Sequence, residues 1–73
     1  MDDRTLIRWK LKTNHLTSVW LINQLEAHGV KTDKAEVTNT LNGSRKGPKV
    51  DEIIRVSLEI LEHYEKVMGQ GTG

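Results

Sequence analysis

The chain contains no cysteine and no phenylalanine, and proline occurs only once among its 73 residues. Without cysteine there is no disulfide framework and no thiolate metal site. No apolar run approaches the roughly 20 residues that a membrane-spanning helix needs. The N-terminus also lacks the basic and apolar regions of a signal peptide. We therefore expect a cytoplasmic protein with no membrane segment, of a length that fits one small domain.

Charge is distributed unevenly along the chain, although the net charge is only +1. Residues 1–50 hold nine basic and five acidic residues, which leaves +4, whereas residues 51–73 hold two basic and five acidic residues, which leaves −3. The first two thirds of the chain can therefore face a polyanion, and the last third would repel one.

The spacing of apolar residues predicts four helices and no strand, and therefore an all-α fold, a small four-helix bundle. The expected helices cover residues 3–12, 18–28, 33–42 and 49–67. Gly29 and Asn42-Gly43 are stop signals, and Pro48 suits the first turn of the last helix. We expect residues 1–68 to form a single domain and the Gly-rich residues 69–73 to form a flexible tail.

Short polar residues precede the predicted helices where N-caps are needed. Thr17 is the predicted cap of the second helix, and Thr32 or Asp33 caps the third. Glu36 is placed to complete a capping box with Asp33. Because phenylalanine is absent, we expect Trp9, Trp20 and Tyr64 to supply all the aromatic bulk of the core.

No pattern of residues indicates catalysis or a metal centre. The three histidines, at positions 15, 28 and 63, are not at ligand spacing from one another. No nucleophile–histidine–acid set or Gly-rich phosphate loop is apparent, and so small a core offers little room for a substrate pocket. We expect no enzymatic activity, no cofactor and no small-molecule substrate.

Four features follow one another in the middle of the chain: Leu16-Thr17, the apolar pair Leu21-Ile22, the turn Gly29-Val30, and VTNTLNG at residues 37–43. A basic loop, Ser44-Arg45-Lys46, and a closing helix come next. This order resembles the helix-turn-helix of the lambda-repressor/Cro-like family of phage and mobile-element regulators, in which Ile-Ser-x-x-x-x-Gly ends the third helix. The resemblance covers residues 14–60 and places a helix-turn-helix at residues 17–42, with a longer second helix and a longer turn than the family has.

The resemblance implies a transcriptional regulator that binds double-stranded DNA, with the third helix in the major groove. The residues expected to face the bases are Lys34, Ala35, Thr38 and Asn39. The residues expected to contact phosphates are Thr17, Ser18, Lys31, Arg45, Lys46 and Lys49. Lys34 suits guanine, Asn39 suits adenine, and Thr38 or Ala35 suits a thymine methyl group.

Two acids on the third helix support an alternative. Asp33 and Glu36 would oppose phosphates, although both also suit a helix N-terminus. In size, charge pattern and divergent turn the chain is similar to small phage antirepressors, which bind the DNA-binding domain of a partner repressor. In that case Asp33 and Glu36 would pair with cations of the partner.

The end of the fourth helix is a candidate for self-association. We expect Tyr64, Val67 and Met68 to lie beyond the reach of the first three helices and to offer a small homodimer contact. A monomer of this size would make few phosphate contacts, so a dimer on two half-sites, or a larger partner, would be needed for useful affinity.

Overall fold

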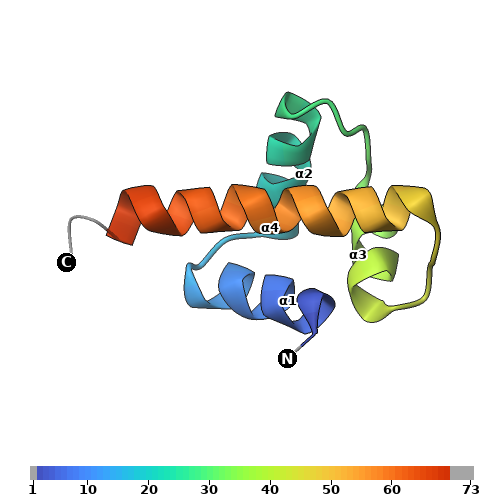
Figure 1. Ribbon diagram of the computed structural model, residues 1–73, viewed down its shortest axis with the longest axis horizontal. Coiled ribbons are helices and arrows are strands. Elements are labelled where there is room, and N and C mark those ends of the chain that lie inside the picture. Colours follow the sequence, from blue (N-terminus) through green and yellow to red (C-terminus); the bar gives the residue numbers. More distant parts are fainter. Residues whose placement is uncertain (1, 70–73) are drawn as a thin grey trace.

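The computed structural model describes residues 2–69 and consists of four α-helices with short connections (Figure 1). The helices are α1 (Asp3–Thr13), α2 (Ser18–Ala27), α3 (Lys34–Asn42) and α4 (Pro48–Gly69). Residues 2–69 contain no strand, so the prediction of an all-α fold with four helices is confirmed. Residues 70–73, where most of the predicted tail falls, lie outside the described residues.

The longest helix, α4, provides the surface on which the other three helices pack. Its 22 residues span about 33 Å at 1.5 Å per residue, close to the 37 Å length of the whole molecule. In Figure 1, α1 lies alongside α4 and runs in the same direction, and α3 lies beside the N-terminal part of α4. At the far end of α1, Lys10 and Asn14 both contact the carboxylate of Glu65.

The core is apolar and draws on all four helices and on the connection between α2 and α3. Its buried members are Ile7, Leu11, Leu21, Leu25, Val30, Val37, Leu41, Ile53, Val56, Ile60 and Leu61. The last four of these explain the single apolar face of α4, because Ile53, Val56 and Ile60 recur at intervals of three and four residues and Leu61 follows Ile60. Val30 is 4% exposed and fills the core from the connection between α2 and α3.

The prediction that Trp9 belongs to the core is wrong. Trp9 is 51% exposed, because Ile7 and Leu11 turn inward and a residue two positions from each faces about 160° away from them. Trp20 and Tyr64 are half-buried and meet edge-on, with ring centroids 5.4 Å apart and an interplanar angle of 73°. Tyr64 therefore lies within reach of α2, contrary to the prediction that it extends beyond the first three helices.

The first three helices begin at side-chain caps. Asp2, Thr17 and Asp33 each accept a hydrogen bond from the backbone N–H three residues further along, at 2.7, 3.1 and 2.7 Å respectively. Each cap satisfies one of the N–H groups that a helix start leaves without an acceptor. The predicted cap Thr17 is confirmed, and of the two candidates for α3, Thr32 and Asp33, the cap is Asp33.

The same three helices end in the same way. His15, Gly29 and Gly43 adopt left-handed backbone conformations, with φ of 57°, 84° and 79°. The N–H of the residue after each donates to the carbonyl five residues earlier, at 2.8, 2.9 and 2.9 Å, which is the Schellman arrangement. Glycine adopts this conformation without strain, whereas for a residue such as His15 it costs about 1–2 kcal/mol.

Ser57 gives a test of the core. It is fully buried in the apolar face of α4, and its hydroxyl has no hydrogen-bond partner among the described residues. An unsatisfied buried hydroxyl costs about 1–3 kcal/mol, so Ser57→Ala should raise the free energy of unfolding by about 1 kcal/mol. Urea denaturation measures this change. The control Ser44→Ala, at an exposed loop position, should shift it by less than about 0.5 kcal/mol. A clear loss of stability in Ser57→Ala would contradict the conclusion that the buried Ser57 hydroxyl has no hydrogen-bond partner.

Candidate nucleic-acid interface

The outer face of α3 carries the residues predicted to face DNA bases. Lys34, Ala35 and Thr38 are exposed, and Asn39 is half-buried. The opposite face of the helix is buried through Val37, Thr40 and Leu41. Helix α3, nine residues long, thus presents one face to solvent and packs against the core with the opposite face.

The C-terminal half of α3 is attached to α1 by a polar contact. The backbone carbonyl of Thr40 accepts a hydrogen bond of 2.9 Å from Nε of Arg4. The Thr40 side chain is buried, and its hydroxyl donates to the carbonyl of Glu36 at 2.7 Å. Arg4 therefore restrains the position of α3, a role that nothing in the sequence indicated.

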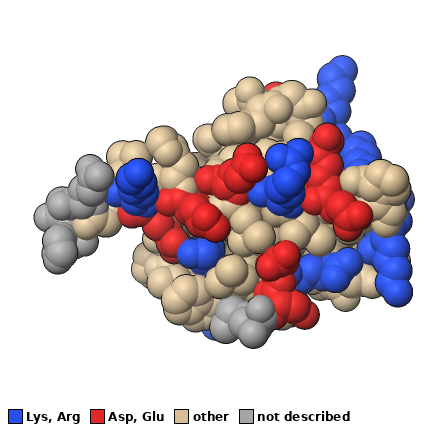
Figure 2. Space-filling model, in the orientation of Figure 1, with Lys and Arg blue, Asp and Glu red and all other residues tan. Residues whose placement is uncertain are grey.

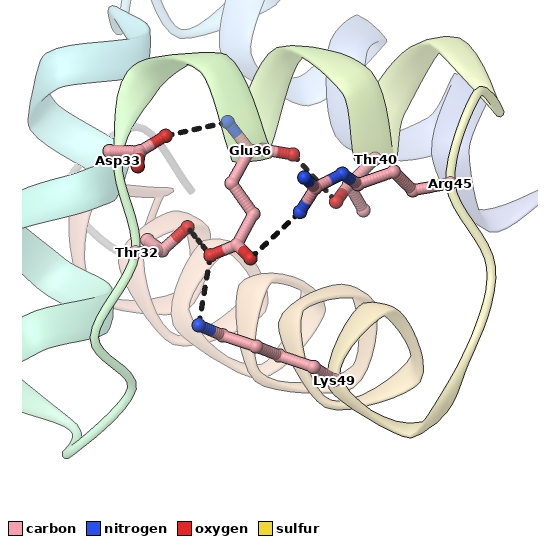
Figure 3. A network of polar contacts seen from close by, with 6 residues as sticks. All are labelled: Thr32, Asp33, Glu36, Thr40, Arg45 and Lys49. Atoms are coloured by element: carbon pink, nitrogen blue, oxygen red, sulfur yellow. Dashed lines mark hydrogen bonds and ion pairs between the residues drawn. The ribbon is translucent and has the colours of Figure 1, made fainter.

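Glu36 is the centre of a polar network that joins four segments (Figure 3). Its Oε1 accepts a hydrogen bond of 2.7 Å from the Thr32 hydroxyl and lies 3.1 Å from Nζ of Lys49. Its Oε2 lies 3.2 Å from a terminal nitrogen of Arg45. The network links the connection before α3, α3 itself, the loop after it and the first turn of α4.

The predicted capping box is formed only in part. The N–H of Glu36 donates to Asp33, but the Glu36 carboxylate points toward Thr32 and the two cations instead of returning to the backbone of Asp33 (Figure 3). Two cations attract the Glu36 carboxylate more strongly than the neutral backbone N–H of Asp33 does. The sequence could not show this, because Arg45 and Lys49 approach Glu36 only when the loop has folded.

The network leaves Glu36 shielded and its cations accessible. The Glu36 side chain is 15% exposed, whereas Arg45 and Lys49 are 54% and 53% exposed. The hydrogen bond from Thr32, and then that from Lys49, hold the pKa of Glu36 below its ordinary value of 4.5. One carboxylate shared by two cations leaves a net positive charge at this position.

The remaining residues predicted to contact phosphates lie at the same end of the molecule or at the start of α2. Lys31 and Lys46 are exposed, and within residues 2–69 neither has an ion-pair partner. Thr17 is exposed and caps α2, and Ser18 is half-buried. In Figure 2 basic side chains gather at the end of the molecule where α3 and α4 are joined, and acidic side chains lie along α4.

Two basic residues of α1 that were not among those predicted to contact phosphates lie beside α2 and α3. Arg8 and Lys12 line a cleft of about 320 Å³ together with Ser18 of α2 and Thr38 of α3. Both are exposed, and no carboxylate of the described residues lies within ion-pair distance of either. The available signal was their spacing of four residues, which places two cations on one face of a helix.

The alternative site residues are both engaged within the chain. Asp33 caps α3, and Glu36 is paired with Arg45 and Lys49. Residues 28–33 connect α2 to α3, a longer connection than the three or four residues of most helix-turn-helix motifs.

The pKa of Glu36 leads to a prediction about stability. Because the pKa is lower in the folded than in the unfolded chain, the ionised carboxylate stabilises the fold above about pH 4.5, and this contribution is lost as pH falls through the folded-state value. Glu36→Gln should therefore lower the midpoint of thermal unfolding at pH 7. The difference in midpoint between this variant and the unmodified protein should shrink below pH 4.5. The control Glu52→Gln changes the same charge on an exposed residue of α4 and should leave the pH profile unchanged. Identical profiles for both variants would contradict the stabilising role of the network.

No three histidine or acidic side chains among residues 2–69 gather closely enough to hold a metal ion. No helix in the same part of the chain has the length and apolar character needed to span a membrane. Comparison with protein-family models, with curated proteins and with solved structures finds no match to this chain.

Proposed function

We propose that this chain is a cytoplasmic helix-turn-helix transcriptional regulator of the lambda-repressor/Cro-like type, from a phage or mobile element, that binds double-stranded DNA. The observation that carries the proposal is the exposed polar face of α3 with cations on two sides of it. Arg45 and Lys49 gather at Glu36, and Arg8 and Lys12 gather at Thr38. Glu36 and Thr38 point about 160° apart around the helix axis.

In this proposal α3 enters the major groove between two rows of phosphates. Lys34 binds guanine, Asn39 binds adenine, and Ala35 or Thr38 contacts a thymine methyl group. The flanking cations contact the phosphates, which position the helix without specifying sequence. The backbone N–H groups at the start of α2, beside Thr17 and Ser18, add a further phosphate contact.

The Glu36 network supports the proposal in two ways. It holds Arg45 and Lys49 in place before DNA arrives, which lowers the entropy lost when long side chains are immobilised on binding. It also neutralises the acid that would otherwise repel phosphates. For the same reason Glu36 offers little free negative charge to a basic protein, which leaves Asp33 as the one exposed acid of the alternative site. DNA is therefore the partner we propose.

The test is fluorescence anisotropy of a labelled mixed-sequence DNA duplex at increasing salt. We expect nonspecific binding with a dissociation constant of about 1–100 μM near physiological salt. The logarithm of the binding constant should fall linearly with the logarithm of salt concentration, because each neutralised phosphate releases counterions. Absence of binding at low salt would overturn the proposal.

Individual lysines refine the test. Lys46→Ala should weaken binding to every duplex sequence and lower the magnitude of the salt slope by about one. Lys66→Ala is the matched control, because Lys66 is also exposed but lies near the opposite end of α4. From Lys49, at the start of α4, to Lys66 the helix is about 25 Å long, which exceeds a Debye length of about 10 Å. The affinity of the Lys66→Ala variant for DNA should therefore stay unchanged. Equal losses in the two variants would mean that the contact is a diffuse charge effect.

A further inference from the structure

The C-terminal end of α4 projects past the other three helices in Figure 1 and forms one wall of a groove whose other wall is α2. The groove has a volume of about 310 Å³. Trp20 of α2 and Tyr64 of α4 meet edge-on within it, and Ile60 adds an aliphatic surface. The DNA interface proposed above, at the other end of α4, does not use these residues.

The projecting wall continues the apolar face of α4 beyond the core. Val67 and Met68 follow Tyr64 by three and four residues, so they lie on the same side of the helix. They are 55% and 59% exposed, although each lines the groove. Burial of such apolar side chains is favourable, and these two remain in contact with water as long as no partner covers them.

The groove carries almost no charge, unlike the surface around it. Apart from two histidines, Glu59 is the one acidic or basic side chain that lines the groove and carries charge at neutral pH, and Glu59 already pairs with Arg55 at 3.3 Å. Charged residues make up 29% of the whole chain. A strongly charged partner would therefore find no complementary group here, whereas another uncharged apolar surface would meet no repulsion.

The same patch supplies both parts of a reciprocal contact, a hollow beside Trp20 and Tyr64 and two projecting side chains at the helix end. An interface between two identical subunits related by a two-fold axis requires such a self-complementary patch. We infer that a second copy of this chain docks in the groove, with Val67 and Met68 of each copy placed in the hollow of the other. This inference does not depend on DNA binding.

The size of the patch sets the strength of the dimer. A stable interface uses roughly 20–30 residues from each partner, and the groove is lined by nine. The dimer therefore dissociates readily, with a dissociation constant on the order of 10–100 μM.

Sedimentation equilibrium in the absence of DNA, at protein concentrations from about 1 μM to about 1 mM, tests whether the chain forms this dimer. The average mass should rise from the 8.3 kDa of one chain toward twice that value. In the double variant Val67→Gln, Met68→Gln the dissociation constant should increase at least about tenfold. Both positions are exposed, so circular dichroism should show unchanged helix content.

Val19→Gln is the matched control, because Val19 is 56% exposed but does not line the groove. It should dimerise like the unmodified protein. A mass that stays at one chain at all concentrations would overturn the inference. Dimerisation unaffected by the double variant, or reduced equally by Val19→Gln, would place the contact elsewhere and overturn it as well.

Discussion

The apolar face of α4 is the surface on which the rest of the fold depends. A chain of this length buries only about 60% of its unfolded surface, and α1 and α2 have little contact with each other. Each of the first three helices packs on α4, and α3 also packs on both α1 and α2. One long helix thus provides a common core for three short ones, each of which would be marginal alone.

Polar contacts determine where the surface side chains lie once this core has formed. Arg4 attaches the end of α3 to α1, and Glu36 attaches the beginning of α3 to the loop and to α4. The helix with the proposed base-contacting residues is therefore restrained at both ends. Its outer face remains available because these contacts involve the buried side of the helix at Thr40 and one flank of the outer face at Glu36.

The sequence was most informative where local chemistry decides the structure. Thr17, Asp33, Gly29 and Gly43 mark helix ends through caps and turns that involve only neighbouring residues. Three of them were predicted outright, and Asp33 was one of two predicted candidates. The sequence was least informative where residues distant in sequence meet. The orientation of the Glu36 carboxylate and the cleft at Arg8 depend on how helices pack, and the exposure of Trp9 depends on which face of α1 turns inward.

The two ends of α4 are joined by an uninterrupted helix, so the directions in which their side chains point are fixed relative to each other. Each residue turns the helix by about 100°. Insertion or deletion of one residue near Ser57 would leave the network at Lys49 in place but rotate Tyr64, Val67 and Met68 away from α2. A change in the length of α4 therefore separates contacts at its two ends that a substitution between them would leave in place. The spacing from Lys49 to Met68 is thus a fixed dimension of the molecule, set by helix geometry rather than by any individual side chain.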